Sequence, residues 1–172
     1  MRRKECERDA AFAWEVLKNS IYSTVSMVCP DGTPYATPVN IIGDEVYNAL
    51  YFHCAGAGER WELLKNGAPV CGTAGSPLSF PAVSTATLLP NQFTTAYRSA
   101  MFRGRAQVVT DEGEKMKAML LLCTAFDPKG MGRFDQAMAH CPAQVIKIVP
   151  EVITGKEHEM HQEPPKAHTC HS

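Results

Sequence analysis

The sequence has no excess of charge of either sign and no long apolar run. It carries 17 Lys and Arg against 18 Asp and Glu in 172 residues, a formal net charge of -1 at pH 7. This balance provides no basic field for nucleic acid and no polybasic patch for an anionic membrane. The first nine residues mix both signs and no apolar run follows them, so we expect neither a signal peptide nor a membrane anchor. The expected protein is cytoplasmic, with neither nucleic acid nor a membrane among its partners.

Cysteine pairs at metal or redox spacing are also missing. The chain has 7 cysteines, an odd number, and none of them forms a CxxC pair. In a reducing compartment we expect free thiols, several of them small core residues, and no disulfide framework. Hydrophobic residues make up 45% of the chain and charged residues 20%, which is ordinary for one globular domain that needs no covalent staples.

Internal repeats and the alternation of strand and helix that marks a parallel sheet are absent as well. What is present is a series of β-branched, alternating segments bounded by turn residues, which predicts strands. The first three are close enough together to form a meander. The predicted strands cover residues 21–28, 35–42, 46–53, 69–74, 97–109 and 144–152.

Helices are expected between and before these strands. The i, i+3, i+4, i+7 spacing of apolar residues predicts a helix over 7–20, and a second is expected over 59–66. Asp111 and Glu114 have the spacing of a capping box before a third helix, which has Met116, Met119, Leu120 and Cys123 on its apolar face. The fold class is therefore mainly β with flanking helices, an antiparallel barrel or strongly bent sheet.

Several residues mark interruptions or packing positions within this pattern. Pro38 cannot donate a ladder hydrogen bond, which predicts an edge, a bulge or the end of pairing. Gly104 suits a bend or a close backbone approach. Residues 75–95 contain three prolines and read as a long loop, which is usually functional or mobile. The core is expected to include Trp14, Trp61, Met116 and Met119, which have helical apolar spacing.

The segment from Tyr51 to Arg60 is the most informative for chemistry. A strand ends, small residues make a turn, and a helix begins with unsatisfied N–H groups. Such a helix start attracts anions, and Arg60 adds a permanent charge with two parallel donors, so a phosphate fits here. The alternative is that the glycines only make a turn and that Arg60 is a solvated surface residue.

The chain resembles the nitroimidazole-resistance family of pyridoxamine 5'-phosphate oxidase-like proteins. The resemblance extends from residue 1 to about 156, with its motifs in the expected order. They are Met1–Lys4, Asp31–Tyr35 with Pro38–Asn40, Tyr51–Ala55, Tyr97–Ser99 with Gly104–Ala106, Glu114–Lys115 and Ile153–Lys156. The resemblance implies a six-stranded antiparallel split barrel over residues 1–156, forming a homodimer that binds flavin mononucleotide (FMN) across its interface.

The resemblance also implies the site residues. Thr37, Pro38, Val39 and Asn40 would run along the flavin ring, His53, Cys54 and Ala55 beside the ribityl chain and phosphate, Arg60 at the phosphate, and Ser99 as an added hydroxyl. His53 is the catalytic candidate, although a histidine that only closes a strand fits the sequence too. The implied activity is that of an FMN-dependent oxidoreductase, nitroreductase-like, acting on a small aromatic or heterocyclic molecule.

The chain departs from the family pattern at two positions and in one loop. Arg60 stands where family members commonly have lysine, and Ile41 where they often have an aromatic residue. Residues 72–95, which would shape the substrate pocket, match only loosely.

The tail at 157–172 carries His158, His161, His168, Cys170 and His171. Its low hydrophobicity favours a solvated, flexible tail without a metal. Some split-barrel relatives bind haem through a histidine near the C-terminus, so a haem- or metal-binding protein, or a non-catalytic flavin binder, is the alternative function.

Overall fold

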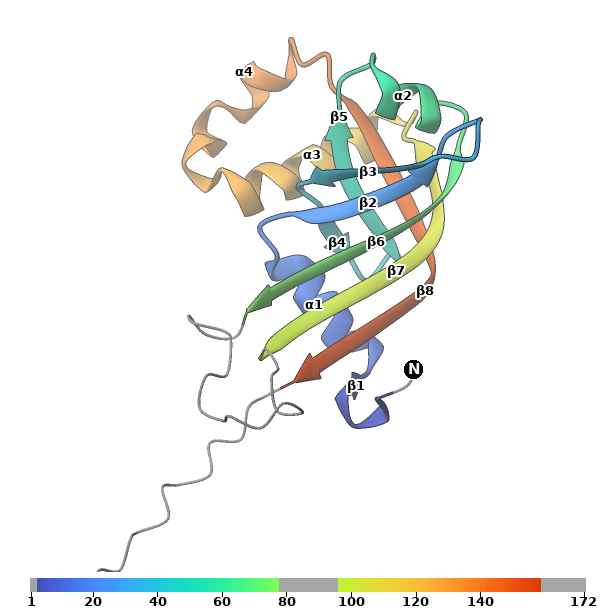
Figure 1. Cartoon of the computed structure of the whole chain (residues 1–172). Helices are drawn as coiled ribbons and strands as arrows, with labels where there is room; N and C mark the ends of the chain where they lie inside the picture. Colours follow the sequence, from blue (N-terminus) through green and yellow to red (C-terminus); the bar gives the residue numbers. More distant parts are fainter. Residues whose placement is uncertain (1–2, 78–95, 159–172) are drawn as a thin grey trace, which may run out of the picture.

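The computed structural model describes residues 3–77 and 96–158, and they form one antiparallel sheet with helices against it (Figure 1). The sheet has eight strands in the order β3-β2-β6-β7-β8-β5-β4, and β1 pairs separately with β8. The strands are β1 (Glu7–Arg8), β2 (Ser23–Val28), β3 (Pro34–Val39), β4 (Ile42–Asp44), β5 (Ala49–Cys54), β6 (Ala68–Pro77), β7 (Tyr97–Val108) and β8 (Gln144–His158). The mainly β split-barrel class is confirmed, with eight strands where six were expected.

The helices are α1 (Ala10–Asn19), α2 (Glu59–Leu64), α3 (Glu112–Phe126) and α4 (Phe134–Met138), with 3-10 turns at Lys4–Cys6 and Pro128–Arg133. The predicted start of the first helix at residue 7 is wrong. The Asp9 side chain caps α1 by accepting a hydrogen bond from the N–H of Phe12 (2.9 Å). Glu7 and Arg8 pair instead with Lys156 and Gly155 of β8.

The predicted three-stranded meander is also wrong. β2 and β3 form the expected hairpin, but within residues 3–77 and 96–158 β3 pairs with no further strand, and β5 pairs with β4 and β8. The second edge of β2 is taken by β6, a strand much later in the chain. Pro38 lies on β3, the edge strand, which confirms the expectation for a residue that cannot donate to a ladder. The turn after β4 falls at residues 45–48, where Asn48 has a φ of 47°.

At Gly104 the backbones of β7 and β8 approach each other closely, as expected for a glycine within a long strand. The pairing of β7 with β8 shifts register between Arg103 and Gly104. A Cβ atom at Gly104 would overlap the carbonyl oxygen of Val149 and lie 2.9 Å from its carbonyl carbon. The two backbones can therefore pass each other here only because residue 104 has no side chain.

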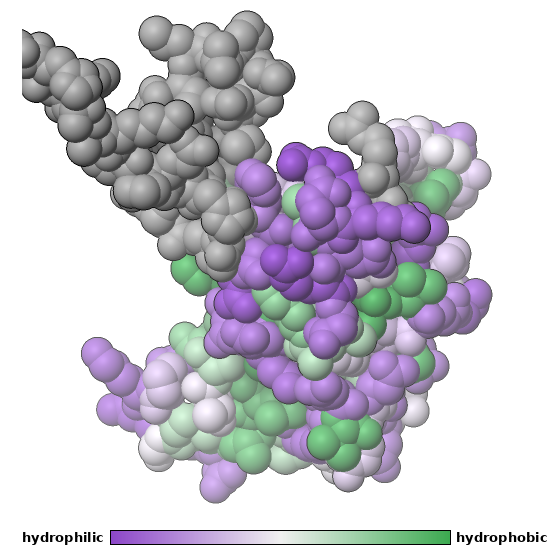
Figure 2. Space-filling view, turned by 90° about the horizontal axis from the view of Figure 1, so that it is seen from below, coloured by the Kyte–Doolittle hydropathy of each residue, from purple (hydrophilic) through white to green (hydrophobic). Residues whose placement is uncertain are grey.

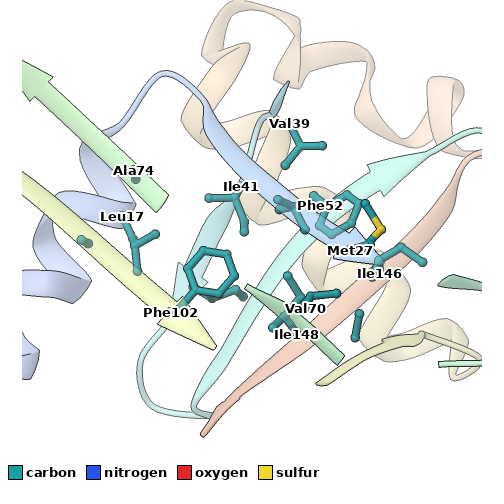
Figure 3. Packing of buried hydrophobic residues seen from close by; sticks show 14 of the residues in the cluster. Leu17, Met27, Val39, Ile41, Phe52, Val70, Ala74, Phe102, Ile146 and Ile148 are labelled. Carbon is teal, nitrogen blue, oxygen red and sulfur yellow. The ribbon is translucent and has the colours of Figure 1, made fainter. Parts of the chain in front are cut away.

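Two hydrophobic cores lie on opposite faces of the curved sheet. The first fills the barrel with residues such as Ile41, Phe52 and Phe102 (Figure 3). It also receives Trp14 and Leu17 from α1. The second lies between α3 and the outer side of β5 and β8, and includes Tyr51, Met119 and Leu122. The core prediction holds for Trp14 and Met119, and Trp61 packs partly buried against the first core. It is wrong for Met116, which is 44% exposed because α3 turns it away from β5.

Helix α3 is fixed to the sheet by a charged network. The N–H of Glu114 donates to the side chain of Asp111, as the capping pattern predicts (2.7 Å). The Glu114 carboxylate accepts from the Tyr51 hydroxyl (2.8 Å) and from Lys147 (2.7 Å). Lys117 forms an ion pair with Asp44 (2.6 Å). These bonds hold the first turns of α3 over β4, β5 and β8.

We expect Glu114→Gln to destabilise the fold by about 1–2 kcal/mol at neutral pH, because a charge-assisted pair is lost from a half-buried position. The hydrogen bond from Lys147 lowers the pKa of Glu114 below its usual 4.5, with a further contribution from Tyr51. A lowered folded-state pKa gives stability that is present above pH 4.5 and lost as the pH falls through the folded value. The urea midpoints of wild type and variant should therefore differ at pH 7 and converge in acid. Glu112→Gln, in the same helix turn, is the control, and equal effects of both substitutions would contradict the prediction.

Most of the predicted loop at 75–95 and most of the predicted tail at 157–172 lie outside the described residues. Residues 75–77 belong to β6, and 78–95 are not described. β8 continues to His158, two residues into the predicted tail, and 159–172 are not described. No helix in the described part is long and apolar enough to cross a membrane. Seen from below, hydrophilic side chains cover much of the described surface, with hydrophobic areas between them (Figure 2).

Candidate functional site

The end of β5 presents a histidine to solvent and buries the next residue. His53 is exposed, whereas Cys54 is 3% exposed and belongs to the barrel core. The chain then turns through small residues to Gly58, whose φ of 92° favours glycine. Helix α2 begins at Glu59. The predicted sequence of strand, small-residue turn and helix is therefore present.

Arg60 is the cationic group of this turn. Helix α2 is only 6 residues long and has Glu59 and Glu62 in its first turn, so its dipole contributes little to anion binding. Arg60 is half-buried, which differs from the alternative of a fully solvated surface arginine. Its charge acts on both neighbouring side chains. Desolvation and then Arg60 lower the pKa of His53, while desolvation raises the pKa of Cys54 against the opposing effect of Arg60.

Three hollows connect the predicted cofactor residues. The first, of about 210 Å³, is the turn hollow, lined by His53, Cys54, Ala55, Gly56, Pro142 and Ala143. The second, of about 150 Å³, is the helix pocket, lined by Asn40, His53, Met119, Leu122, Cys123, Phe126 and Asp127. The third, of about 480 Å³, is the edge hollow, lined by Tyr22, Pro38, Val39 and Asn40. His53 belongs to the first two and Asn40 to the last two, so the hollows form one continuous surface.

A larger hollow of about 550 Å³ lies elsewhere, between α2, β7 and β8. Its lining includes Lys65, Arg105 and Glu151 and none of the predicted site residues. Volume alone does not mark a site, and the connected hollows bring an imidazole and an amide together next to the turn that leads to Arg60. We therefore take the connected hollows as the candidate site.

Three predicted residues do not line these hollows. Arg60 is one of them, although its charge acts on His53 and Cys54, which do line the turn hollow. Thr37 is half-buried on β3, on the opposite face from Pro38 and Asn40, and its hydroxyl is 3.5 Å from the carbonyl oxygen of Pro38. Ser99 pairs with Lys156, whereas His53 pairs with Val145. The part of β8 between those partners spans roughly 35 Å when extended. A single chain therefore does not bring Ser99 to His53.

The sequence analysis missed one wall of the site. Met119, Leu122, Cys123 and Phe126 of α3 line the helix pocket with His53 and Asn40. Met119 and Cys123 were predicted on an apolar helix face, and apolar periodicity signals such a face without showing that part of it borders a cavity. Pro142 and Ala143, just before β8, had no sequence signal at all.

Comparison with known families agrees with this geometry. The family model described as pyridoxamine 5'-phosphate oxidase matches residues 9–157. The chain belongs to the pyridoxamine 5'-phosphate oxidase-like family. The match covers every described strand of the sheet except Glu7–Arg8, and ends one residue before the end of β8. The pyridoxamine 5'-phosphate oxidase-like family suspected from the motifs is thus confirmed.

Several solved structures share the fold of this chain at low sequence identity. A putative 5-nitroimidazole antibiotic resistance protein from Bacteroides thetaiotaomicron is 21% identical, with 87% of this chain and 84% of that chain covered and a TM-score of 0.69. The flavocytochrome Anf3 from Azotobacter vinelandii is 19% identical, with 93% and 72% covered and a TM-score of 0.74. A FAD and heme binding protein from Mycobacterium smegmatis is 17% identical, with 91% and 74% covered and a TM-score of 0.74. No curated protein matches the chain.

Proposed function

We propose that this protein is an FMN-dependent oxidoreductase that acts on a small aromatic or heterocyclic molecule at a homodimer interface. One observation carries the proposal: the half-buried Arg60 stands in the first turn of α2, just after the turn whose residues 53–56 line the turn hollow, and this hollow continues past His53 to Asn40 and the edge hollow. A cation for one phosphate, followed by a long surface with polar groups, suits a mononucleotide. Reduction of a nitro group is the candidate reaction, on resemblance alone.

The chain's own residues fit such a cofactor from one end to the other. Arg60, with Cys54 and Ala55 at the turn, would hold the phosphate. Pro38, Val39 and Asn40 would lie along the ring. The Asn40 side-chain N–H donates to the carbonyl oxygen of Ile21 (2.7 Å), which fixes the amide and leaves its oxygen free to accept a hydrogen bond. A bound flavin supplies the redox chemistry, so that the protein has only to bind, orient and shield.

His53 lines both the turn hollow and the helix pocket, so it would face both the cofactor and the substrate. Desolvation and the charge of Arg60 lower its pKa, which favours the neutral imidazole. A neutral imidazole has one donor and one acceptor nitrogen. His53 would therefore donate one hydrogen bond to the substrate or accept one from it, and would add no charge to the site.

The outer face of the sheet supports the homodimer. Cross-strand neighbours on β2, β6, β7 and β8 form two rows there, and Figure 1 shows α1 on the other side of β6 and β7. The rows are Thr24–Thr73–Met101–Thr154 and Ser26–Cys71–Arg103–Val152. Met101 is 54% exposed and Val152 52%. Ser99 lies on this same face, so pairing of two such faces would give Ser99 access to the partner's site, which it lacks in its own chain.

We expect Met101→Asp to convert a dimer into a monomer, because pairing the faces would bury a carboxylate without a partner. Size-exclusion chromatography with light scattering measures the change. Met116→Asp is the matched control, since Met116 is 44% exposed on α3, away from the two rows. In the dimer, Cys71 should also react with maleimide more slowly than in the monomeric variant. A wild-type monomer would contradict the shared site.

The absorption spectrum of the freshly purified protein, with the released cofactor identified by mass, tests the function directly. Flavin bands and FMN in the extract would support it, and a colourless protein that takes up no added FMN would refute it. A Soret band would favour the haem alternative. Of the tail histidines, only His158 is described. Its Nδ1 lies 4.0 Å from the Cys6 sulfur, and the described residues contain no group of three metal-ligating side chains. The cytoplasmic location stays a prediction.

A further inference from the structure

The helix pocket differs in chemistry from the hollows on either side of it. Met119, Leu122, Cys123 and Phe126 recur at intervals of three and four residues, so α3 presents them on one side. They make an apolar wall. Asn40 and His53 stand opposite, on the sheet side, and Asp127 follows the last residue of α3.

The walls of this pocket are held in place by the packing around them. Met119 and Leu122 are 7% and 3% exposed and belong to the second core. Tyr51 lies two residues before His53, on the same face of β5, and its hydroxyl donates to Glu114 of α3. The helix and the strand that form the pocket are therefore fixed to each other, and the pocket is preformed.

The polar groups of the pocket favour an uncharged ligand. Among the described residues, no group donates to the Asn40 side-chain oxygen and none bonds to the His53 ring. Desolvation and the charge of Arg60 lower the pKa of His53. This favours the neutral imidazole, which has one donor and one acceptor nitrogen. Asp127 adds a negative charge at the end of the pocket, and an apolar wall makes burial of a ligand carboxylate costly.

The size of the pocket limits the ligand to one ring. Its volume is about 150 Å³, and an apolar cavity of about this volume in another protein binds benzene. A three-ring flavin does not fit into such a space. The pocket opens instead beside the surface along which the proposed cofactor would lie, since it shares His53 and Asn40 with the neighbouring hollows.

We propose that the helix pocket is the substrate subsite and takes a neutral, single-ring aromatic or heterocyclic molecule with one hydrogen-bonding substituent. As a substrate subsite it rests on the proposed flavin function. The ring packs against Cys123 and Phe126, and its substituent bonds to Asn40 and His53. Anions are disfavoured by the charge of Asp127 and the apolar wall, and fused two-ring molecules by the volume of the pocket.

Titration of the protein with three related probes tests the selectivity. Saturation-transfer NMR detects the binding, and in the FMN-loaded protein the flavin spectrum detects it as well. Benzamide has the expected ring and substituent, benzoate replaces the substituent by an anion, and 2-naphthamide adds a ring. We expect benzamide to bind at least about tenfold more tightly than the other two, a difference of about 1.4 kcal/mol or more. Equal affinities would overturn the inference.

Two variants of Cys123 locate the binding. Cys123→Phe fills the pocket and should weaken benzamide binding at least about tenfold through loss of apolar contact. Ala125→Phe, which adds the same ring to the exposed side of α3, should leave it unchanged. Cys123→Ala enlarges the pocket and should improve 2-naphthamide binding, which a merely unfolded variant would not do. Unchanged benzamide affinity in folded Cys123→Phe would overturn the inference.

The outcomes separate the subsite from the cofactor. A protein that takes up FMN but shows no preference for benzamide overturns the subsite and leaves the proposed function standing. A protein that takes up no FMN overturns the proposed function, and the substrate role of the pocket falls with it. Because the NMR signal does not depend on flavin, the two failures are distinguishable.

Discussion

Replacing Arg60 by alanine should weaken FMN binding roughly 10- to 100-fold, since a hydrogen bond to a charged group contributes about 1.5–3 kcal/mol. The charge of Arg60 acts on His53 and Cys54, which line the turn hollow. The first turn of α2 otherwise carries two acidic residues, Glu59 and Glu62. Without Arg60, a phosphate at this turn would face those carboxylates with no counter-charge. Fluorescence titration of the flavin-free protein with FMN measures the loss.

Riboflavin, which lacks the phosphate, separates a phosphate contact from a general effect on the site. Its affinity should be the same in wild type and Arg60→Ala. Arg60→Lys should recover part of the FMN affinity, because lysine keeps the charge but loses the two parallel donors. Arg133→Ala removes an exposed arginine outside the site and serves as the control for net charge. Equal losses of FMN and riboflavin affinity, or no loss of either, would refute the phosphate role.

The strands were predictable because each has a local signal, whereas their pairing was not. Alternating residues in 21–28 and 97–109 predicted β2 and β7 to within a few residues, and Pro38 predicted the edge position of β3. The meander failed because β5 pairs with β8, a partner about a hundred residues away. Nothing in residues 46–53 alone distinguishes a nearby partner strand from a distant one.

The site was predictable in part for a similar reason. The turn from His53 to Arg60 is one continuous segment, so its chemistry could be read from the sequence. The wall that α3 contributes could not be predicted from the sequence. Periodicity shows that residues such as Cys123 share an apolar face, but not which part of the protein that face contacts. The same limit explains Met116, which has apolar character and nevertheless points away from the sheet. Ser99 shows a further limit, since the sequence does not say which protomer would use it.

Replacing Gly104 by alanine should destabilise the protein by about 3 kcal/mol or more, because the clash is with backbone and no side chain can move aside. The new Cβ would overlap the carbonyl oxygen of Val149 at the point where β7 and β8 shift register. Relief would require the two longest strands of the sheet to separate. β8 also carries Lys147 and pairs with β5 beside His53, so such a separation would also disturb the site.

Urea unfolding followed by circular dichroism measures this cost. Gly132→Ala is the matched control, because a Cβ there meets no atom within 4 Å and its backbone is not left-handed. It should change stability by less than about 0.5 kcal/mol, as surface substitutions usually do. Similar midpoints for the two variants would show that β7 and β8 separate here at little cost. In that case β7 and β8 would separate easily at Gly104. The strands that support His53 would then be held together less firmly than their hydrogen bonding indicates.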